Sequence, residues 1–407
     1  MRIALVTPEY ITEHTFDGGL ANYTHRLALS LRDMHHEPVV FIPHDGDQVI
    51  DHERIPVHRV QTWNPKRQWK KFYTYIDLFN DRTNYRFNMA TNLWWRSRRL
   101  NAAVRAEHAV RPFDVIHYAH LGGLGLLRPR GIPSVVRLSS STKLCQQHGG
   151  YGEETAEMRQ QIWVESMALR KADRIFGPSK KIIEMMQTEI KRPISLIETP
   201  FIANTGALND DLFLTHAAGK KYLLFFGSVC LIKGVGTIAE IIKPLLKFHP
   251  DLHFIFIGKK VPGQRGGCPM ERVITAAGKY ADRIVWLPAQ RHDRLFPFIQ
   301  NAHAVILPSL TDNFPNACIE AMAFGRVVVG TRGNGFEQMI RDGVSGFLCD
   351  PGDAKDLQRT VDKALALSPE ARAAMGAAAA ERIAQLTPEN VVAQVLDEYL
   401  AAADLYR

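Results

Sequence analysis

The sequence lacks the features that mark membrane proteins, disulfide-bonded domains and dinucleotide-binding enzymes. No run of eighteen apolar residues occurs in the 407 residues, so no segment is long enough to cross a bilayer as a helix. The five cysteines form no CxxC pair, which favours reduced thiols over disulfides or a metal centre. The pattern GxGxxG is also absent, which excludes the common dinucleotide-binding fingerprint.

The composition is that of a globular protein. With 46% hydrophobic residues in a chain of 407, there is enough sequence for two domains, each with its own core. Residues Met1–Thr7 are typical of a buried strand rather than of a signal peptide. We therefore expect a cytoplasmic protein.

The stretch Ser309–Gly325 carries the most specific pattern in the chain. It follows an apolar run, Ala304–Leu307, that predicts a buried strand. A helix is expected after the loop, with Asn316 as its N-cap and Gly325 at its end. The N-terminus of that helix then lies beyond the carboxyl end of a strand, which is the ligand crevice of an open parallel sheet.

The predicted helix N-terminus suits a phosphate or diphosphate, because its first backbone N–H groups are unpaired and carry partial positive charge. Asp312 precedes the helix and Glu320 lies one turn inside it. A carboxylate can accept hydrogen bonds from two vicinal hydroxyls, so this pair suits a ligand with a sugar on each side of a diphosphate. The residues between the two acids that we expect to line the site are Asn313, Phe314, Pro315, Asn316 and Ala317.

This pattern of an acid, seven residues and Glu-Ala-Met-Ala-x-Gly resembles the retaining nucleotide-sugar glycosyltransferases of family four (GT4). The resemblance implies that Asp312 holds the hydroxyls of the donor sugar and that Glu320 holds the ribose. The family usually has Glu at the first position, and Asp is one methylene shorter. The resemblance also implies a metal-independent enzyme without a cofactor, a nucleoside-diphosphate-sugar donor and a glycan or lipid-linked acceptor.

The fold class that the resemblance implies is α/β of the GT-B type, with two Rossmann-like, doubly wound parallel-sheet domains facing an interdomain cleft. We expect residues 1–205 to form the acceptor-binding domain and residues 206–385 to form the nucleotide-sugar-binding domain. A last helix, residues 386–407, is expected to cross back to the N-terminal domain.

Three motifs in the N-terminal half are candidates for the site. Gly18 and Gly19 follow the first strand and resemble the family's loop near the donor phosphates and the acceptor. His120 follows a later strand, where relatives have a histidine that contacts the donor sugar. The third motif, Asp45-Gly-Asp47, could bind Mg²⁺ and a diphosphate, although such a pair in a polar loop is more often a turn.

In the C-terminal half, the apolar strand Tyr222–Phe226 leads into a glycine, Ser228 and then Lys233. The family usually has Arg and Lys here to neutralise the donor diphosphate. Lys233 fits, whereas Ser228 removes one cation, for which Lys259 and Arg265 are candidate replacements. Backbone groups from Leu287 to Ala289 are expected near the nucleotide base.

The stretch 59–111 is strongly basic, with twelve Lys or Arg against three acids and four of the six tryptophans. Such a composition suits an anionic membrane surface or a lipid-linked, phosphate-bearing acceptor. The alternative is a helical insertion whose aromatic residues are core and whose charges are solvated. With membrane contact, the location would be peripheral at the inner face of the cell membrane, and we do not expect nucleic acid as a partner.

The predicted activity is transfer of a sugar to a hydroxyl acceptor with retention of configuration, in cell-envelope or polysaccharide biosynthesis. Retention is implied by the resemblance. Lys233, Asp312, Glu320 and His120 are the expected catalytic residues. Two alternatives remain at this point, a GT-B-like sugar isomerase or phosphorylase and a catalytically silent nucleotide-sugar binder.

Overall fold

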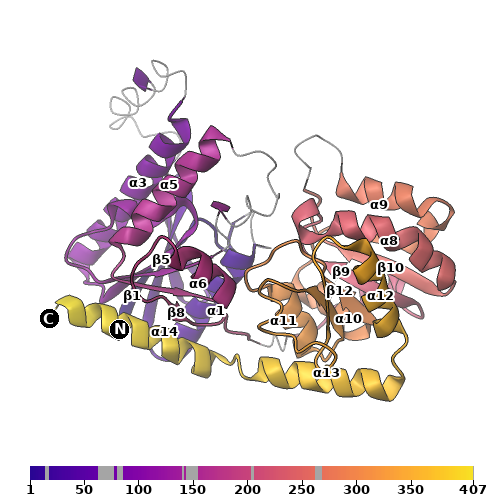
Figure 1. Ribbon diagram of the computed structural model, residues 1–407. Helices are drawn as coiled ribbons and strands as arrows, with labels where there is room; N and C mark the ends of the chain where they lie inside the picture. The colour runs from indigo at the N-terminus through magenta and orange to yellow at the C-terminus, as the bar shows by residue number, and fades with distance from the viewer. Residues whose placement is uncertain are drawn as a thin grey trace. The chain divides into compact units, whose positions relative to one another are not determined.

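The computed structural model describes residues 1–13, 18–62, 78–79, 86–139, 142–143, 155–202, 206–261 and 268–406 (Figure 1). The chain divides into two compact units. Unit 1 contains Met1–Gln146, Glu153–Pro200 and Pro388–Arg407, and unit 2 contains Phe201–Thr387. Several positions of the predicted basic stretch, together with Arg265 and Cys145, lie outside the described residues.

Unit 1 is built on an eight-stranded sheet in the order β3-β4-β2-β1-β5-β6-β7-β8. All neighbouring strands are parallel except β3 and β4, which form an antiparallel hairpin. Its elements are β1 (Arg2–Val6), α1 (Gly19–Asp33), β2 (Glu37–His44), β3 (Gln48–His52), β4 (Ile55–Gln61), α3 (Asn88–Val110), β5 (Val115–Ala119), η2 (Leu121–Leu127), β6 (Ser134–Arg137), α5 (Ala156–Lys171), β7 (Arg174–Gly177), α6 (Lys180–Gln187), β8 (Ser195–Leu196), α14 (Pro388–Ala403) and η5 (Asp404–Tyr406).

The first strand shows why the sheet forms. The side chains from Ile3 to Val6 are at most 1% exposed, as expected for a parallel strand that is covered on both faces. The strand order reverses between β1 and β5. The chain adds β2 and β4 on one side of β1, and it adds β5 to β8 on the other side. Ligands bind at such a switch point in open α/β sheets.

Helix α14 packs against α1 and against the middle strands of unit 1 (Figure 1). The hydroxyl of Tyr399 lies 2.7 Å from Nδ1 of His117 on β5. Glu398 forms a forked ion pair with Arg174 on β7, at 2.8 and 3.1 Å, and accepts a hydrogen bond from Ser195 on β8. The last helix of the chain is therefore part of the core of unit 1.

Unit 2 is built on a six-stranded parallel sheet in the order β11-β10-β9-β12-β13-β14. Its switch point lies between β9 and β12. Its elements are α7 (Asp211–His216), β9 (Lys221–Phe226), η3 (Leu231–Lys233), α8 (Val235–Phe248), β10 (Leu252–Ile257), α9 (Pro269–Ala277), η4 (Gly278–Arg283), β11 (Ile284–Leu287), α10 (His292–Asn301), β12 (Ala304–Ile306), α11 (Asn316–Ala323), β13 (Val328–Thr331), β14 (Phe347–Cys349), α12 (Ala354–Leu365) and α13 (Pro369–Ala384).

The core of unit 2 joins the inner strands to helices α8, α9 and α12. Leu223 and Phe225 on β9 are at most 1% exposed, and full burial of each such side chain contributes about 1.5–3 kcal/mol. Within the described ranges, no helix combines the length and the hydropathy of a membrane-spanning segment.

Candidate active site

The switch point of unit 2 brings together a lysine and a carboxylate. Lys233 follows β9 and Asp312 follows β12, and these two strands are neighbours in the sheet. The Lys233 ammonium lies 2.5 Å from Oδ2 of Asp312, which is only 9% exposed. Two residues that the sequence predicts for the site are therefore in direct contact, although 79 positions separate them.

Lys233 is positioned by a tight turn against Pro308, in the loop that follows β12. The following residue, Gly234, has a φ of +77°, which favours glycine, and a Cβ there would lie 1.8 Å from the carbonyl oxygen of Pro308. The amide of Leu310 donates to the carbonyl of Ile232 at 2.8 Å. The short helix η3 is thus fastened to the loop that carries Asp312.

Asp312 is held from both sides. Its Oδ1 accepts from the Asn313 amide at 3.0 Å, and its Oδ2 lies 3.4 Å from the Ser309 hydroxyl. Its backbone carbonyl accepts from the amide of Gly335 at 3.1 Å. A Cβ on Gly335 would lie 1.8 Å from the carbonyl oxygen of Asn313, so only glycine allows this approach.

Helix α11 begins one residue earlier than the sequence predicts. Pro315 is its N-cap and Asn316 is its first helical residue, so the prediction of Asn316 as the cap is wrong. No side chain caps the helix, since proline at this position offers only its carbonyl. The amides of Asn316 and Ala317, both half-buried, precede the first hydrogen bonds within the helix. Gly325 follows the helix with a φ of +63°, as predicted for its end.

Glu320 is buried in α11 and contacts a histidine that the sequence did not single out. Its carboxylate is 6% exposed, and Oε1 lies 3.3 Å from Nε2 of His292. His292 is the first residue of α10 and stacks on Phe296, with 5.0 Å between ring centroids. Nothing local in the sequence signals this contact, because it depends on how α10 packs beside α11.

The end of β9 also approaches the end of β10 closely. A Cβ on Gly258 would lie 1.7 Å from the carbonyl oxygen of Gly227, which immediately precedes the half-buried Ser228. The amide of Val229 donates to the carbonyl of Lys259 at 2.9 Å. Lys259 is therefore near Ser228 along this edge of the sheet, and its role as the second cation stays a prediction.

Leu287 ends β11 on the far side of β10. Its side chain is 7% exposed, and its carbonyl accepts from the amide of Gly258 at 3.0 Å. The indole of Trp286 donates to the carbonyl of Gly258 at 3.0 Å. The role of the backbone near Leu287 in reading a nucleotide base stays a prediction.

In unit 1, the N-terminus of α1 meets a carboxylate of the same chain. Helix α1 begins at Gly19 with Gly18 as N-cap, and Oε1 of Glu9 accepts from the amide of Ala21 at 3.2 Å. A Cβ on Gly18 would lie 2.5 Å from that same Oε1. The N-terminus of α1 is therefore occupied by an anionic group, here the carboxylate of Glu9, which lies close against Gly18.

His120 lies at the end of β5, at the switch point of unit 1. It is 2% exposed, and its backbone amide donates to the carbonyl of Arg137 at 3.1 Å. Burial lowers the pKa of His120, and Glu165 and Glu189 oppose this shift. Its Nδ1 is buried and has no hydrogen-bond partner among the described residues. The ring is therefore neutral at physiological pH and retains an unused nitrogen.

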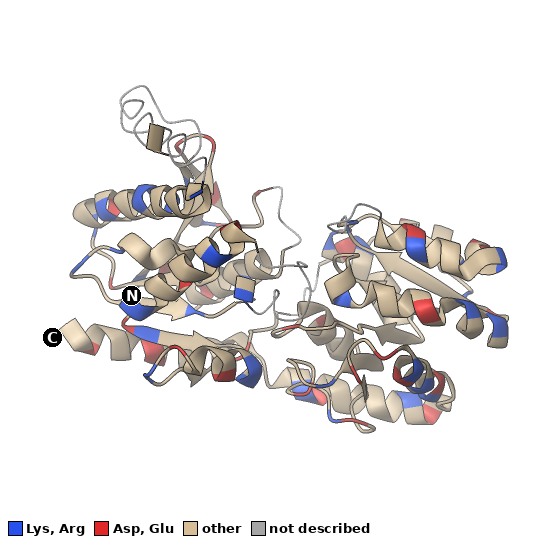
Figure 2. Cartoon of the chain, turned by 45° about the horizontal axis from the view of Figure 1, so that its top comes forward, with Lys and Arg blue, Asp and Glu red and all other residues tan. Residues whose placement is uncertain are grey.

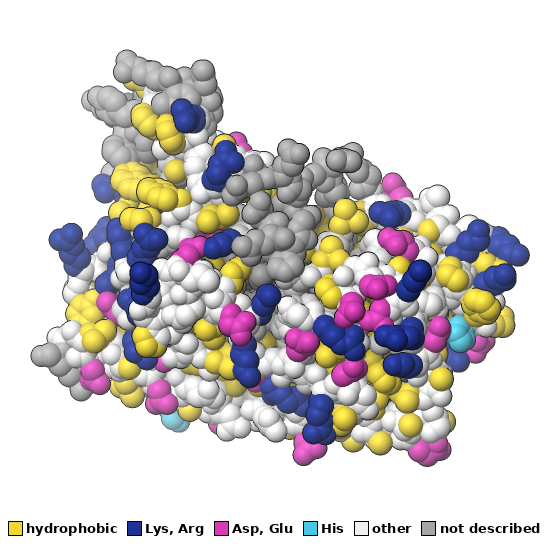
Figure 3. Space-filling model, in the orientation of Figure 1, with side chains coloured by type: hydrophobic (Ala, Val, Ile, Leu, Met, Phe, Trp, Pro, Cys, Tyr) yellow, Lys and Arg dark blue, Asp and Glu magenta, His cyan; other side chains and the backbone are white. Residues whose placement is uncertain are grey.

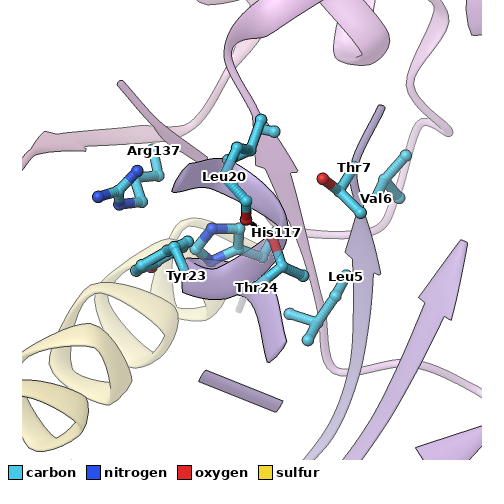
Figure 4. A pocket seen from close by; sticks show the side chains of 9 residues that line it. Leu5, Val6, Thr7, Leu20, Tyr23, Thr24, His117 and Arg137 are labelled. Atoms are coloured by element: carbon cyan, nitrogen blue, oxygen red, sulfur yellow. Dashed lines mark hydrogen bonds between the residues drawn. The ribbon is translucent and has the colours of Figure 1, made fainter. Parts of the chain in front are cut away.

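A cavity of about 10 Å³ lies between β1, β5, β6 and the first turns of α1 (Figure 4). This is about the smallest volume that holds one water molecule, so the cavity is too small for a sugar. The Arg137 guanidinium stacks on the ring of Tyr23, 3.6 Å from its centroid, and donates to the Thr199 hydroxyl at 2.9 Å. Burial and Arg137 lower the pKa of His117 to about 3.

The Asp45-Gly-Asp47 motif is a turn between β2 and β3. Oδ1 of Asp47 accepts from the Gln61 amide at 2.7 Å and lies 3.4 Å from the Arg99 guanidinium. These contacts fit the turn better than a Mg²⁺ site.

The sequence matches two glycosyltransferase families over different parts of the chain. Residues 18–193 match the Glycosyl transferase 4-like domain, and residues 211–382 match Glycosyl transferases group 1. D-inositol 3-phosphate glycosyltransferase of Nocardiopsis dassonvillei is 26% identical over 315 residues, which are 73% of this chain and 73% of the relative.

Solved structures give the same result for the fold. Sucrose-phosphate synthase from Thermosynechococcus elongatus matches with a TM-score of 0.77 at 19% identity, over 98% of both chains. Anabaena HepE in complex with UDP-glucose matches with a TM-score of 0.70 at 16% identity, over 98% of this chain and 99% of that chain. The predicted family and fold are thereby confirmed: the chain belongs to the group 1 (GT4) glycosyltransferases, has the GT-B fold, and transfers a sugar from a nucleotide-sugar donor.

Proposed function

We propose that this enzyme binds a UDP-sugar at the switch point of unit 2 and transfers the sugar, with retention, to a hydroxyl group of a phosphate-bearing acceptor. The observation that carries the proposal is the Lys233–Asp312 pair beside the uncapped N-terminus of α11. One cation and two helix-end amides there can face a diphosphate, and carboxylates on either side can face its two sugars.

Binding of the sugar donor would break the ion pair between Lys233 and Asp312. Lys233 would leave Asp312 and contact the diphosphate, which frees the Asp312 carboxylate to accept hydrogen bonds from the hydroxyls of the transferred sugar. Glu320 would hold the ribose, with His292 orienting the carboxylate from the opposite side. Asn313 and Phe314 are buried and would shape the loop rather than contact phosphate.

The transfer step needs no nucleophile from the enzyme in this mechanism. The bond from the anomeric carbon to the diphosphate oxygen breaks, and a bond to the acceptor oxygen forms on the same face of the sugar. The acceptor proton moves to the departing diphosphate. Lys233 and the α11 N-terminus stabilise the negative charge that develops on the leaving group. Such electrostatic stabilisation of the transition state is usually the largest contribution to the rate acceleration.

UDP and a phosphate-bearing acceptor are favoured by the relatives. Anabaena HepE was solved with UDP-glucose, and the Nocardiopsis relative is named for an inositol phosphate. In unit 1, the neutral His120 with its unused Nδ1 is suited to contact a sugar hydroxyl. We assign residues 1–205 to acceptor binding, residues 206–385 to donor binding, and the last helix to the acceptor-binding part.

A peripheral membrane location at the cytoplasmic side remains part of the proposal. Helix α3 carries basic residues along its length (Figure 2), and hydrophobic and basic side chains adjoin one another over α3 and α5 (Figure 3). Trp163 on α5 is 59% exposed, which suits an interfacial contact. Trp95, in contrast, is 3% exposed and belongs to the core, as the alternative interpretation of the basic stretch requires.

The proposal is tested by calorimetric titration with UDP-, GDP- and ADP-sugars, followed by product analysis with and without acceptor. We expect one UDP-sugar to bind in the micromolar range and to give a glycosylated product only when an acceptor is added. Binding without any product would favour a silent binder. A sugar phosphate formed from free phosphate would favour a phosphorylase.

A further inference from the structure

We propose that unit 1 contains a Zn²⁺ site formed by His25, His52 and Glu53, separate from the sugar-transfer site. His25 lies in the middle of α1, His52 ends β3, and Glu53 follows in the turn to β4. One ligand atom from each residue lies within 4.8 Å of the others. The described residues contain no other such group of three.

The distances are close to those of a tetrahedral zinc centre. Nε2 of His25 lies 3.5 Å from Oε2 of Glu53. With zinc–ligand bonds of about 2.0–2.1 Å, the edge of a tetrahedron is about 3.4 Å, so this pair is already spaced for one ion. The His25 and His52 rings are 5.6 Å apart between centroids, and all three ligand atoms lie within 4.8 Å of one another, so the other two spacings would shorten when an ion binds.

The surroundings also suit a metal. Nε2 of His52 is buried and has no hydrogen-bond partner among the described residues, so a ligand there would satisfy it. The hydroxyl of Tyr10 lies 3.3 Å from Nδ1 of His25, on the side of the ring away from Glu53. Such a contact to the second ring nitrogen fixes the orientation of a metal-binding histidine.

The backbone of the turn is held in an unusual conformation that presents Glu53 to the histidines. Glu53 and Arg54 have φ angles of +54° and +63°, where glycine or asparagine is normally found. The Arg32 guanidinium donates to the Glu53 carbonyl at 2.6 Å and is paired with Asp33 at 2.7 Å. The nearby arginine is thereby partly neutralised and fastens the turn to α1.

The chemical type of the three metal ligands indicates which ion the site prefers. Two imidazoles and one carboxylate suit Zn²⁺ rather than Mg²⁺ or Ca²⁺, which prefer oxygen ligands. Three protein ligands leave one position for water. A bound ion would tie α1 to the β3–β4 hairpin, and through Tyr10 it would reach the loop after β1. We therefore infer a stabilising role for the ion rather than a part in sugar transfer.

The test is calorimetric titration of the metal-free, untagged chain with ZnCl₂, together with the visible spectrum of the Co²⁺ form. We expect one Zn²⁺ per chain and the d–d bands of four-coordinate Co²⁺. An excess of about 100 times Kd should raise Tm by about 5 °C or more. His25→Gln, His52→Gln and Glu53→Gln should each weaken Zn²⁺ binding at least about tenfold.

His58→Gln is the matched control. His58 lies on the neighbouring strand β4, is half-buried and has one carboxylate, Glu107, at 4.0 Å, but it belongs to no group of three ligands among the described residues. The control should bind Zn²⁺ like the wild type. Circular dichroism of the metal-free variants should match the wild type, and Glu53→Gln, at an exposed position, guards against loss of folding. The absence of stoichiometric Zn²⁺ binding, or equal binding by all four variants, would overturn the proposal.

Discussion

The two units are both built on a sheet with a switch point but differ in the chemistry at that point. In unit 2, charged groups are paired across the site, Lys233 with Asp312 and His292 with Glu320. In unit 1, the corresponding edge holds buried, neutral imidazoles and the buried Arg137 guanidinium, whose partners are the uncharged side chains of Tyr23 and Thr199. The comparison shows that sheets with the same kind of switch point can carry charged side chains in one unit and buried, uncharged rings in the other, which fits the proposed diphosphate site in unit 2 and the proposed hydroxyl contacts in unit 1.

The largest effect should come from removing the cation of unit 2. Lys233→Ala should lower kcat about 100- to 1,000-fold, since one group that stabilises the leaving diphosphate is lost. Steady-state kinetics with the preferred donor measures this. Lys243→Ala, at an exposed position of α8, should leave kcat unchanged. Equal kcat values for the two variants would contradict the role of Lys233 as the cation that binds the diphosphate in unit 2.

The next effect concerns Glu320. Glu320→Gln should raise KM for the donor about 10- to 100-fold and change kcat less, because the ribose contact acts in the ground state and the transition state alike. His292→Gln should raise KM by a smaller factor, since His292 acts only through Glu320. A larger effect for His292 than for Glu320 would show that the histidine itself contacts the donor.

Substitution of glycines near the site should test the close backbone approach without changing any charge. Gly335→Ala places a methyl group against the Asn313 carbonyl and should destabilise unit 2 by about 1–3 kcal/mol, with a fall in activity. Gly333→Ala, which meets no atom within 4 Å but has a φ of +71°, should cost only about 1 kcal/mol. Denaturant unfolding measures both, and identical losses would refute the close approach.

These predictions depend on contacts that the sequence reveals unevenly. The segment around Asp312 and Glu320 could be predicted because its loop, acid spacing and helix are local. The ion pair of Lys233 with Asp312 could not, although both residues were expected at the site, because it depends on neighbouring strands. The contact of His292 with Glu320 was missed for the same reason. Trp95, in a stretch whose composition suggested a surface, is core because of the way α3 packs.

Acid should lower the free energy of unfolding, because His117 of unit 1 is buried in its neutral form. The pKa of His117 is lowered to about 3, against about 6.5 in an unfolded chain. The unfolded state therefore binds a proton first, so the stability from the neutral ring is present above about pH 6.5 and is lost as pH falls toward 3. Urea unfolding at several pH values from 7 to 4 should show that the free energy of unfolding falls with pH. His117→Gln should make this fall smaller. An unchanged slope would mean that His117 is not buried as described.

The smallest effect should concern membrane contact. Arg98→Glu combined with Arg105→Glu reverses two charges on α3 and should reduce sedimentation with anionic liposomes severalfold. Arg99 is a poor choice for such a test, because it donates to the Gln61 carbonyl at 2.9 Å and so supports the fold. Arg272→Glu, on α9 of unit 2, is the control. Equal sedimentation of all variants would remove the membrane proposal.

A structure of the chain with a bound UDP-sugar tests the central claim most directly. The account predicts the diphosphate at the Asn316 and Ala317 amides, within about 3.2 Å, with the Lys233 ammonium moved from Asp312 to a phosphate oxygen. A nucleotide bound elsewhere, with the Lys233–Asp312 pair intact, would contradict it.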